Sequence, residues 1–252
     1  MNSFSQPHPK FSIITVTYNA GKVLEDTIQS VVFQTYRNVE YIIVDGNSKD
    51  NTQEIIGKYS KHISKMVSEP DKGLYDAMNK GIRMATGDYL CFLNAGDKFH
   101  EKETLQKIAE TLKDKDLPDV IYGETAIVDE DGNFLHMRRL STPDRLNWKS
   151  FKQGMLVCHQ AFLAKRELAL KYPYDMQYRF SADFDWCIRI MKEANCLHNT
   201  RLTLIDYLNE GMTTRNHKAS LKERFRIMAK HYGWVSTILH HCWFVIRLIL
   251  VR

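Results

Sequence analysis

Short apolar stretches alternate with segments of helical periodicity along the first hundred residues. The apolar stretches are Phe11–Thr17, Val39–Val44, Ile63–Val67 and Tyr89–Leu93. Between them, apolar residues recur every three or four positions, for example in Leu74–Ala85, as expected for one face of a helix. Buried strands that alternate with amphipathic helices predict an α/β fold, with a mostly parallel central sheet flanked by helices.

The pattern changes after Asp97. Val120–Val128 and Phe134–Arg138 flank a polar, glycine-containing turn, which predicts a β-hairpin. Further on, Ser181 precedes a segment with an apolar stripe and is expected to cap a helix that carries Asp183 in its first turn. We therefore expect residues 11–97 to form a nucleotide-binding half, and residues 98–214 to form a half for a second substrate.

Polar residues follow three of the predicted strands. They are Thr17-Tyr18-Asn19, Asp45-Gly46-Asn47-Ser48 and Asn94-Ala95-Gly96-Asp97. Because open α/β sheets bind ligands at the carboxyl ends of their strands, Tyr18 is a candidate for stacking on a base and Asp45 for accepting hydrogen bonds from a nucleoside. Asp97 is a candidate ligand for Mg²⁺ or Mn²⁺, which take one or two protein carboxylates and complete their shell with water and phosphates. Each also has a structural alternative, since Asn and Asp often cap helices or form turns.

The sequence lacks the glycine-rich phosphate loops of dinucleotide-binding and P-loop proteins. Their absence disfavours a Rossmann oxidoreductase, and leaves a metal at Asp97 to hold the phosphates. Five cysteines without a CxxC pair predict reduced core thiols in a cytosolic protein. The polar residues 1–10 predict a loose tail rather than an export signal.

The positive charge of the chain is concentrated at its end. Residues 215–252 contain eight Lys and Arg residues but only one acid, Glu223. This region predicts two basic or amphipathic helices, of which the second, from Trp234 to Val251, suits a membrane interface better than a membrane span. The alternative is a helix packed on the body of the protein. No RNA- or DNA-binding motif accompanies the basic residues, so nucleic acid is not an expected partner.

Three longer runs of sequence resemble a known family. They are Ser12-Ile13-Ile14-Thr15-Val16-Thr17-Tyr18-Asn19, Gln34-Thr35-Tyr36-Arg37-Asn38-Val39-Glu40-Tyr41-Ile42-Ile43-Val44-Asp45-Gly46 and Ser68-Glu69-Pro70-Asp71-Lys72-Gly73-Leu74-Tyr75-Asp76-Ala77-Met78-Asn79-Lys80-Gly81. They resemble the inverting family 2 glycosyltransferases with the GT-A fold, of the bacterial surface-polysaccharide type, over residues 11 to about 211.

The resemblance implies a set of site residues. Those expected around the nucleotide, usually uridine, are Thr17, Tyr18, Asn19, Asp45, Asp71, Asp76 and Asn79. Asp97 matches the last Asp of the DxD-type motif and is expected to hold a divalent ion, although Asn94 and Gly96 depart from the fuller motif. Asp183 matches the catalytic base, with Ala182 in place of the usual Glu. Its alternative role is to stabilise the start of its helix.

His159 and Gln160 match a His-Gln pair of this family and are expected to contact the acceptor or the donor sugar, unless His159 is a core histidine. The stretch from Gly211 to His217 resembles a loop that closes over the donor, so Arg215 or His217 is expected near the diphosphate. The implied activity is metal-dependent transfer of a hexosyl or N-acetylhexosaminyl group, with inversion, from a UDP-sugar to a saccharide or undecaprenyl-linked acceptor. We expect it at the cytoplasmic face of a bacterial inner membrane. The alternative is an inactive nucleotide-binding or membrane-scaffold protein.

Overall fold

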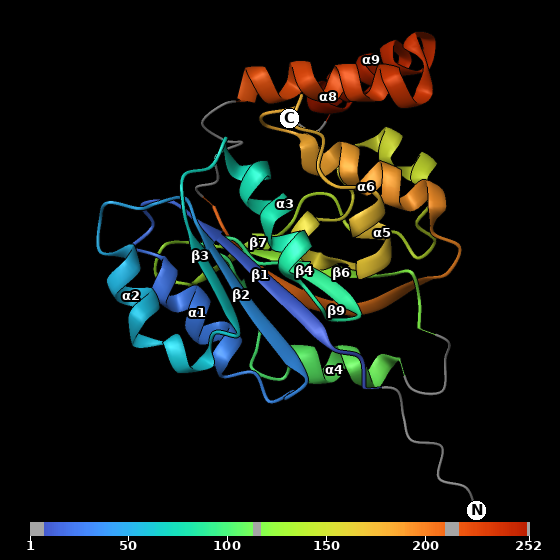
Figure 1. Cartoon of the computed structure of the whole chain (residues 1–252). Coiled ribbons are helices and arrows are strands. Elements are labelled where there is room, and N and C mark those ends of the chain that lie inside the picture. Colours follow the sequence, from blue (N-terminus) through green and yellow to red (C-terminus); the bar gives the residue numbers. More distant parts are fainter. Residues whose placement is uncertain (1–7, 113–116, 210–216, 251–252) are drawn as a thin grey trace, which may run out of the picture.

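The computed structural model describes residues 8–112, 117–209 and 217–250. Figure 1 shows a central sheet with helices around it and a helical layer formed by the end of the chain. In chain order the elements are β1 (Phe11–Thr17), α1 (Leu24–Val32), β2 (Val39–Asp45), α2 (Thr52–Lys58), η1 (Ser60–His62), β3 (Lys65–Ser68), α3 (Leu74–Met84), β4 (Tyr89–Phe92), β5 (Lys98–Phe99), α4 (Thr104–Thr111), β6 (Val120–Val128), β7 (Phe134–Met137), η2 (Trp148–Gln153), η3 (His159–Ala161), β8 (Phe162–Lys165), α5 (Arg166–Lys171), α6 (Ala182–Glu193), β9 (Leu197–Leu208), α8 (His217–Tyr232) and α9 (Trp234–Leu250).

The first half is a parallel sheet, as predicted from the alternating pattern. Strand β1 lies between β2 and β4, β2 also pairs with β3, and all three pairings are parallel. Right-handed crossovers place α1 and α2 on one face of this sheet. Helix α3, which returns from β3 to β4, lies on the other face against β1 and β2. The predicted strand Ile63–Val67 is shifted and runs from Lys65 to Ser68.

The second half makes the sheet mixed rather than mostly parallel. The strand order is β3-β2-β1-β4-β8-β6-β9-β5, with β7 paired to β6 as the predicted hairpin. Strand β8 is antiparallel to both β4 and β6, whereas β9 runs parallel to β6. The sequence pattern did not reveal β9, because its twelve residues are mostly half-buried and show neither an apolar run nor a strict alternation.

Helix α6 is anchored by a cluster of buried aromatic side chains. Trp186 packs against Phe92 of β4, Phe162 of β8 and Tyr174, with ring centroids 5.0–5.9 Å apart. The hydroxyl of Ser181 does not cap this helix as predicted, because it lies 2.9 Å from the hydroxyl of Ser220 in α8. The start of α6 is therefore fixed by another element.

The predicted core thiols divide into two groups. The described cysteines are all free, and Cys91, Cys158 and Cys187 are buried. Cys196 and Cys242 are exposed instead, because they lie at the end of a loop and on the outer side of α9.

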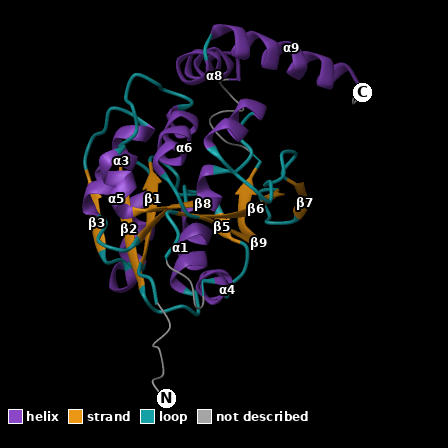
Figure 2. Ribbon diagram, turned by 90° about the vertical axis from the view of Figure 1, so that its right-hand side faces the viewer, coloured by secondary structure: helices purple, strands orange, loops and turns teal. Residues whose placement is uncertain are grey.

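The two C-terminal helices form a layer above the rest of the molecule. Figure 2 shows α8 and α9 on the side toward which β1 points. Gly233, with φ of 81°, separates the two helices in a backbone conformation that favours glycine. No helix in the described part of the chain is long and apolar enough to cross a membrane.

Candidate functional site

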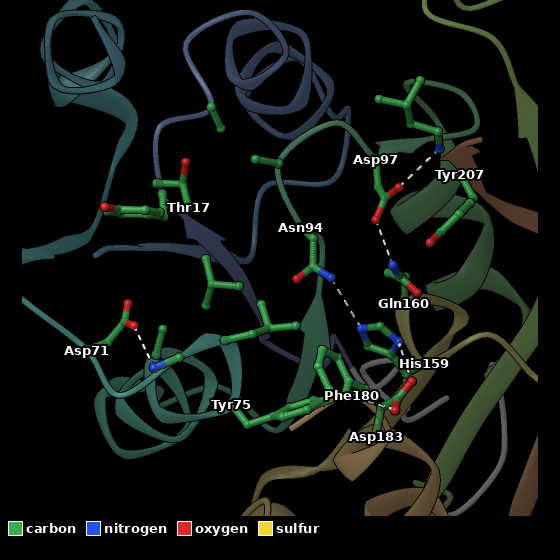
Figure 3. A pocket seen from close by; sticks show the side chains of 18 residues that line it. Thr17, Asp71, Tyr75, Asn94, Asp97, His159, Gln160, Phe180, Asp183 and Tyr207 are labelled. Carbon is green, nitrogen blue, oxygen red and sulfur yellow. Dashed lines mark hydrogen bonds and ion pairs between the residues drawn. The ribbon is translucent and has the colours of Figure 1, made fainter. Parts of the chain in front are cut away.

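A cavity of about 490 Å³ lies at the carboxyl ends of β1 and β4. Figure 3 shows Thr17 and Asp71 on one side of it, and Asp97, His159 and Asp183 on the other. Its polar and aromatic lining residues are Thr17, Tyr18, Asp71, Tyr75, Asn94, Asp97, His159, Gln160, Phe180, Asp183 and Tyr207. The structure thus gathers residues from both halves of the chain around one space, whose size suits a small ligand.

One end of the cavity combines an exposed ring with a carboxylate. The ring of Tyr18 is 63% exposed, so it can stack on a ligand. Asp71 Oδ1 accepts a hydrogen bond from the amide of Gly73 at 2.8 Å, and Asp71 Oδ2 lies on the side of Gly46. A Cβ atom at Gly46 would lie only 2.6 Å from Asp71 Oδ2 and 3.2 Å from the Tyr18 ring. Glycine at position 46 therefore leaves room for both side chains.

Four residues expected around the nucleotide do not line this cavity. The buried carboxylate of Asp45 instead accepts hydrogen bonds from Ser48 and Ser68. Asn19, with φ of 49°, accepts a hydrogen bond from the amide of Lys49, so it is a turn residue rather than a helix cap. Asp76 accepts a hydrogen bond from the amide of Lys72.

Asn79, the fourth of these residues, is buried away from the cavity. Its side chain exchanges hydrogen bonds with the backbone of Tyr174, at 2.8 and 3.0 Å. The pair ties α3 to the loop before α6. Their expected place around the nucleotide stays a prediction.

Asp97 is almost fully buried in the wall of the cavity. It accepts hydrogen bonds from Gln160 Nε2 at 2.6 Å and from the amide of Leu208 at 3.2 Å. Burial raises the pKa of Asp97 to about 7, although both hydrogen bonds favour the charged form. A nearby cation would favour the ionised carboxylate.

Asp97 is the carboxylate of this wall that could bind a divalent cation together with a phosphate. Asn94 Oδ1, which also belongs to the cavity wall, is buried and has no hydrogen-bond partner in the described part of the chain. No group of three or more His, Cys, Asp or Glu side chains gathers as a metal site in the described ranges. In Figure 3 the oxygen of Asn94 points away from Asp97, so the two would bind one cation only if the Asn94 side chain turned, and Mg²⁺ or Mn²⁺ at Asp97 would take its other ligands from water and substrate oxygens.

Asp183 lies at the other end of the same wall. The hydroxyl of Tyr75 donates to its Oδ1 at 3.0 Å, and His159 Nδ1 lies 3.4 Å from its Oδ2. Burial disfavours the charged form, but the hydrogen bond and charge of His159, with help from Arg224 and Tyr75, hold the pKa of Asp183 below its ordinary value. Burial and Asp183 itself raise the pKa of Tyr75, so Tyr75 keeps its proton and remains a donor.

His159 and Gln160 connect the two carboxylates. Adjacent in η3, they contact Asp183 and Asp97 respectively. His159 Nε2 also lies 3.4 Å from Asn94 Nδ2, while Gln160 Oε1 accepts a hydrogen bond from Cys158. His159 lines the cavity and is therefore not an ordinary core histidine.

Asp185, the other carboxylate in the first turn of α6, faces away from the cavity. Its carboxylate is fully buried, and pairs with Arg189 at 2.5 Å and with His231 of α8 at 2.8 Å. Asp185 therefore fastens α8 to α6. Asp183 is the carboxylate of this helix that reaches the cavity.

The sequence alone did not indicate several lining residues. Tyr75 lay within a run quoted for the family resemblance, but its contact with Asp183 spans 108 positions of the chain. Phe180 and Tyr207 belong to segments without a recognisable motif. Arg215 lies outside the described residues, and His217 is the first residue of α8.

Comparison with known sequences identifies relatives over most of the chain. The family model described as "Glycosyl transferase family 2" matches residues 12–172. A "PGL/p-HBAD biosynthesis glycosyltransferase" of Mycobacterium tuberculosis is 35% identical over 185 residues, which are 72% of this chain and 69% of the relative. The amylovoran biosynthesis glycosyltransferase AmsB of Erwinia amylovora is 32% identical over 195 residues, which are 72% of this chain and 64% of the relative.

Solved structures agree on the GT-A glycosyltransferase fold. TarS 1–349 of S. aureus in complex with UDP superimposes with a TM-score of 0.70 and 19% identity, over 87% of this chain and 64% of that one. The mannosyltransferase PcManGT of Pyrobaculum calidifontis, in complex with GDP-Man and Mn²⁺, gives a TM-score of 0.63 and 14% identity, over 94% and 76% of the two chains. With the sequence match over more than half its length, this chain belongs to glycosyl transferase family 2.

Proposed function

We propose that the protein transfers a sugar from a UDP-sugar to a hydroxyl group of a saccharide or lipid-linked acceptor, with inversion at the anomeric carbon. The observation that carries the proposal is the single cavity that joins Tyr18 and Asp71 to Asp97 and Asp183. Tyr18 offers a ring for stacking on the base, and Asp71 offers a carboxylate for the edge of the base. Asp97 offers a carboxylate for a cation, and Asp183 offers one that can accept a proton. The names of the relatives support glycolipid or polysaccharide biosynthesis.

Asp183 has the properties of a general base. It is ionised near neutral pH, because its pKa lies below the ordinary value, and its hydrogen bond from Tyr75 and its contact with His159 fix its orientation. In the proposed reaction it removes the proton of an acceptor hydroxyl as that oxygen attacks the sugar. One displacement without a covalent intermediate gives inversion. The ordered contacts of Asp183 favour this function over an inactive scaffold.

Asp97 is the residue proposed to hold a divalent cation near the donor diphosphate, with Asn94 as a second ligand only if its side chain turns. When bound, the cation would neutralise charge on the leaving diphosphate. Gln160 contributes by keeping Asp97 in place through their 2.6 Å hydrogen bond. TarS has been solved with UDP and PcManGT with GDP-Man and Mn²⁺, which supports a nucleotide-diphosphate donor and a metal.

The C-terminal layer is the part that we propose to meet a membrane. The outer side of α9 is apolar, and includes Trp234, Val235, Ile238, Leu239 and Trp243. The side toward the rest of the protein carries the buried Thr237, together with His241, whose ring contacts Phe225 of α8. Because a helix with its apolar side outward suits an apolar environment, we propose peripheral attachment at the cytoplasmic face of a bacterial membrane.

Calorimetric titration tests the donor site without knowledge of the acceptor. UDP, GDP, dTDP and NADH are titrated into the protein, each with and without Mn²⁺. We expect UDP to bind, and Mn²⁺ to tighten this binding in the wild type but not in the Asp97→Ala variant. Binding of GDP alone would replace the proposed donor by a GDP-sugar. The absence of any nucleotide binding would contradict the transferase proposal.

A further inference from the structure

Glu223 is the only acidic residue in the basic end of the chain, and it is directed toward the body of the protein. Its Oε1 accepts a hydrogen bond from the amide of Arg179 at 2.9 Å. Its Oε2 accepts hydrogen bonds from the amides of Phe180 and Ser181, at 2.8 and 3.0 Å. One carboxylate thus binds three consecutive amides that enter α6.

These amides belong to the segment that leads to Asp183. Phe180 lines the cavity, and Asp183 lies two residues after Ser181, in the first turn of α6. The amides of Arg179, Phe180 and Ser181 precede the first turn of α6, so the helix offers them no carbonyl and they need an acceptor from elsewhere. The Ser181 hydroxyl, which contacts Ser220, is not that acceptor. Glu223 provides the missing acceptor for the residues just before α6.

We propose that Glu223 is a positioning residue, which acts through the backbone of residues 179–181 to set the place of Asp183 in the cavity. The proposal rests on the function proposed above for Asp183. Tyr75 and His159 hold the carboxylate of Asp183 directly, and Glu223 holds the backbone from which that carboxylate extends. Helix α8 is in this respect part of the active site, although the carboxylate of Glu223 does not line the cavity.

Arg224, the residue after Glu223 in α8, also acts on Asp183. The charge of Arg224 contributes to the low pKa of Asp183, and its Nε is buried with no hydrogen-bond partner among the residues that the structure describes. Two neighbouring residues of α8 therefore act on the base, one through the backbone and one through charge. A helix that served only as a surface layer would not need either interaction.

The test compares Glu223→Ala, which removes the acceptor, with Glu223→Gln, which keeps one of the two oxygens. Turnover is followed as UDP release from a panel of UDP-sugars, with and without the saccharide acceptors that support wild-type turnover. UDP affinity is measured by calorimetry. The matched control is Glu193→Ala, which removes an ion pair with Lys171 at the opposite end of α6.

We expect kcat to fall by roughly 100-fold in the Ala variant and by roughly 10-fold in the Gln variant, because misplacement of a catalytic group by about 1 Å costs rates of this order. KM for the donor and UDP affinity should stay within about twofold, since Tyr18 and Asp71 are not affected. Glu193→Ala should retain its kcat. If the Ala variant does not fold, the Gln variant alone decides.

Amide hydrogen exchange separates failure of this inference from failure of the proposed function. In the Gln variant, the peptide containing Arg179, Phe180 and Ser181 should lose protection. Unchanged kcat in both variants of a turning-over enzyme, or a parallel loss of kcat and UDP affinity, would overturn the inference. If the wild type turns over no UDP-sugar, the proposed function is wrong. Hydrogen exchange then tests the role of Glu223 by itself: unchanged amide exchange of this peptide in the Gln variant would overturn that role as well.

Discussion

The two carboxylates proposed for catalysis have different electrostatic environments, although both are buried in one cavity wall. Asp97 has hydrogen bonds from an amide side chain and a backbone amide, and burial raises its pKa to about 7. Asp183 interacts instead with His159, with the charge of Arg224 and with Tyr75. Together these interactions outweigh the effect of burial and lower the pKa of Asp183. Groups whose environments separate their pKa values in this way commonly have separate chemical roles. This difference supports Asp183 as the proton acceptor and Asp97 as a ligand that needs a cation.

Replacement of Asp183 by Asn tests the first role. Asn cannot accept the proton, so we expect kcat to fall by at least about 100-fold, the lower range for loss of a general base. UDP affinity should change by less than about twofold, because the nucleotide end of the cavity is not altered. Steady-state kinetics and calorimetry on the same preparation measure both quantities.

Asp185→Asn is the matched control, since it lies two residues away in the same turn. It breaks a buried ion-pair group with Arg189 and His231, and should lower the free energy of unfolding by about 3 kcal/mol. The kcat of the folded control should fall far less than that of Asp183→Asn, because Asp185 acts only indirectly, by fastening α8 and its Glu223 to α6. If Asp183→Asn turned over as fast as the control, another residue would have to be the general base.

At the scale of elements, Glu40 of β2 joins strands that are distant in sequence. This buried carboxylate accepts hydrogen bonds from Ser12 of β1 and from Thr86, and pairs with Lys65 of β3 at 2.9 Å. Burial opposes ionisation, but these partners lower the pKa of Glu40 from 4.5 to about 2. The contact network therefore stabilises the parallel half of the sheet only while Glu40 is charged.

This network makes a prediction about acid stability. Because the pKa of Glu40 is lower in the folded state, its contribution is complete above about pH 4.5 and is lost as the pH falls toward 2. Linkage sets this contribution at ~3 kcal/mol near neutral pH. We expect Glu40→Gln to lower the free energy of unfolding by about that amount at pH 7, and by much less at pH 3.

Urea denaturation at pH 7 and pH 3 measures this difference. Glu69→Gln is the control, because the Glu69 side chain is 52% exposed and pairs with Lys80 at the surface, where an ion pair contributes at most about 1 kcal/mol. Equal effects of Glu40→Gln at the two pH values would show that its contacts do not depend on its charge.

At the scale of the whole molecule, α8 and α9 connect the proposed membrane surface with the active site. Lys218, Lys222 and Arg226 recur every four residues along α8 and are exposed, so they form one basic stripe. The apolar outer side of α9 lies in the same layer (Figure 2). Deletion of the whole region would be a poor test of membrane binding, because it would also remove Glu223 and its contacts before α6.

Substitutions on α9 alone give a cleaner test. Leu239→Glu combined with Trp243→Glu places two charges on the outer side of the helix, and should abolish sedimentation with vesicles that contain anionic lipid. Wild-type binding should weaken with salt, because basic residues near such a surface contribute about 1 kcal/mol each. UDP affinity should be unchanged in the double variant.

Leu170→Glu provides the control for this experiment, since Leu170 is an exposed leucine on α5, away from the C-terminal layer. It should sediment like the wild type. If the double α9 variant also sedimented like the wild type, the membrane surface would have to lie elsewhere on the protein.

The sequence by itself determined the parallel half of the sheet, the β6–β7 hairpin, the two C-terminal helices and the family. These features depend on local information, because apolar runs, helical periodicity and contiguous motifs can be read within a short window of sequence. Asp97 was predicted from its place at a strand end, whereas Asp183 was selected by the family resemblance, with which its place at a helix start agrees. The division into residues 11–97 and 98–214 stays a prediction.

Only the tertiary structure decided which side chains act together. Gln160 reaches Asp97 across 63 positions of the chain, and Tyr75 reaches Asp183 across 108. Asp45 lies at the end of a strand, and Asp97 also follows one, yet the Asp45 carboxylate accepts hydrogen bonds from Ser48 and Ser68 and does not line the cavity. The physical reason is that a sequence pattern indicates which element carries a polar residue. The direction of its side chain, and its partners, depend on how distant elements pack.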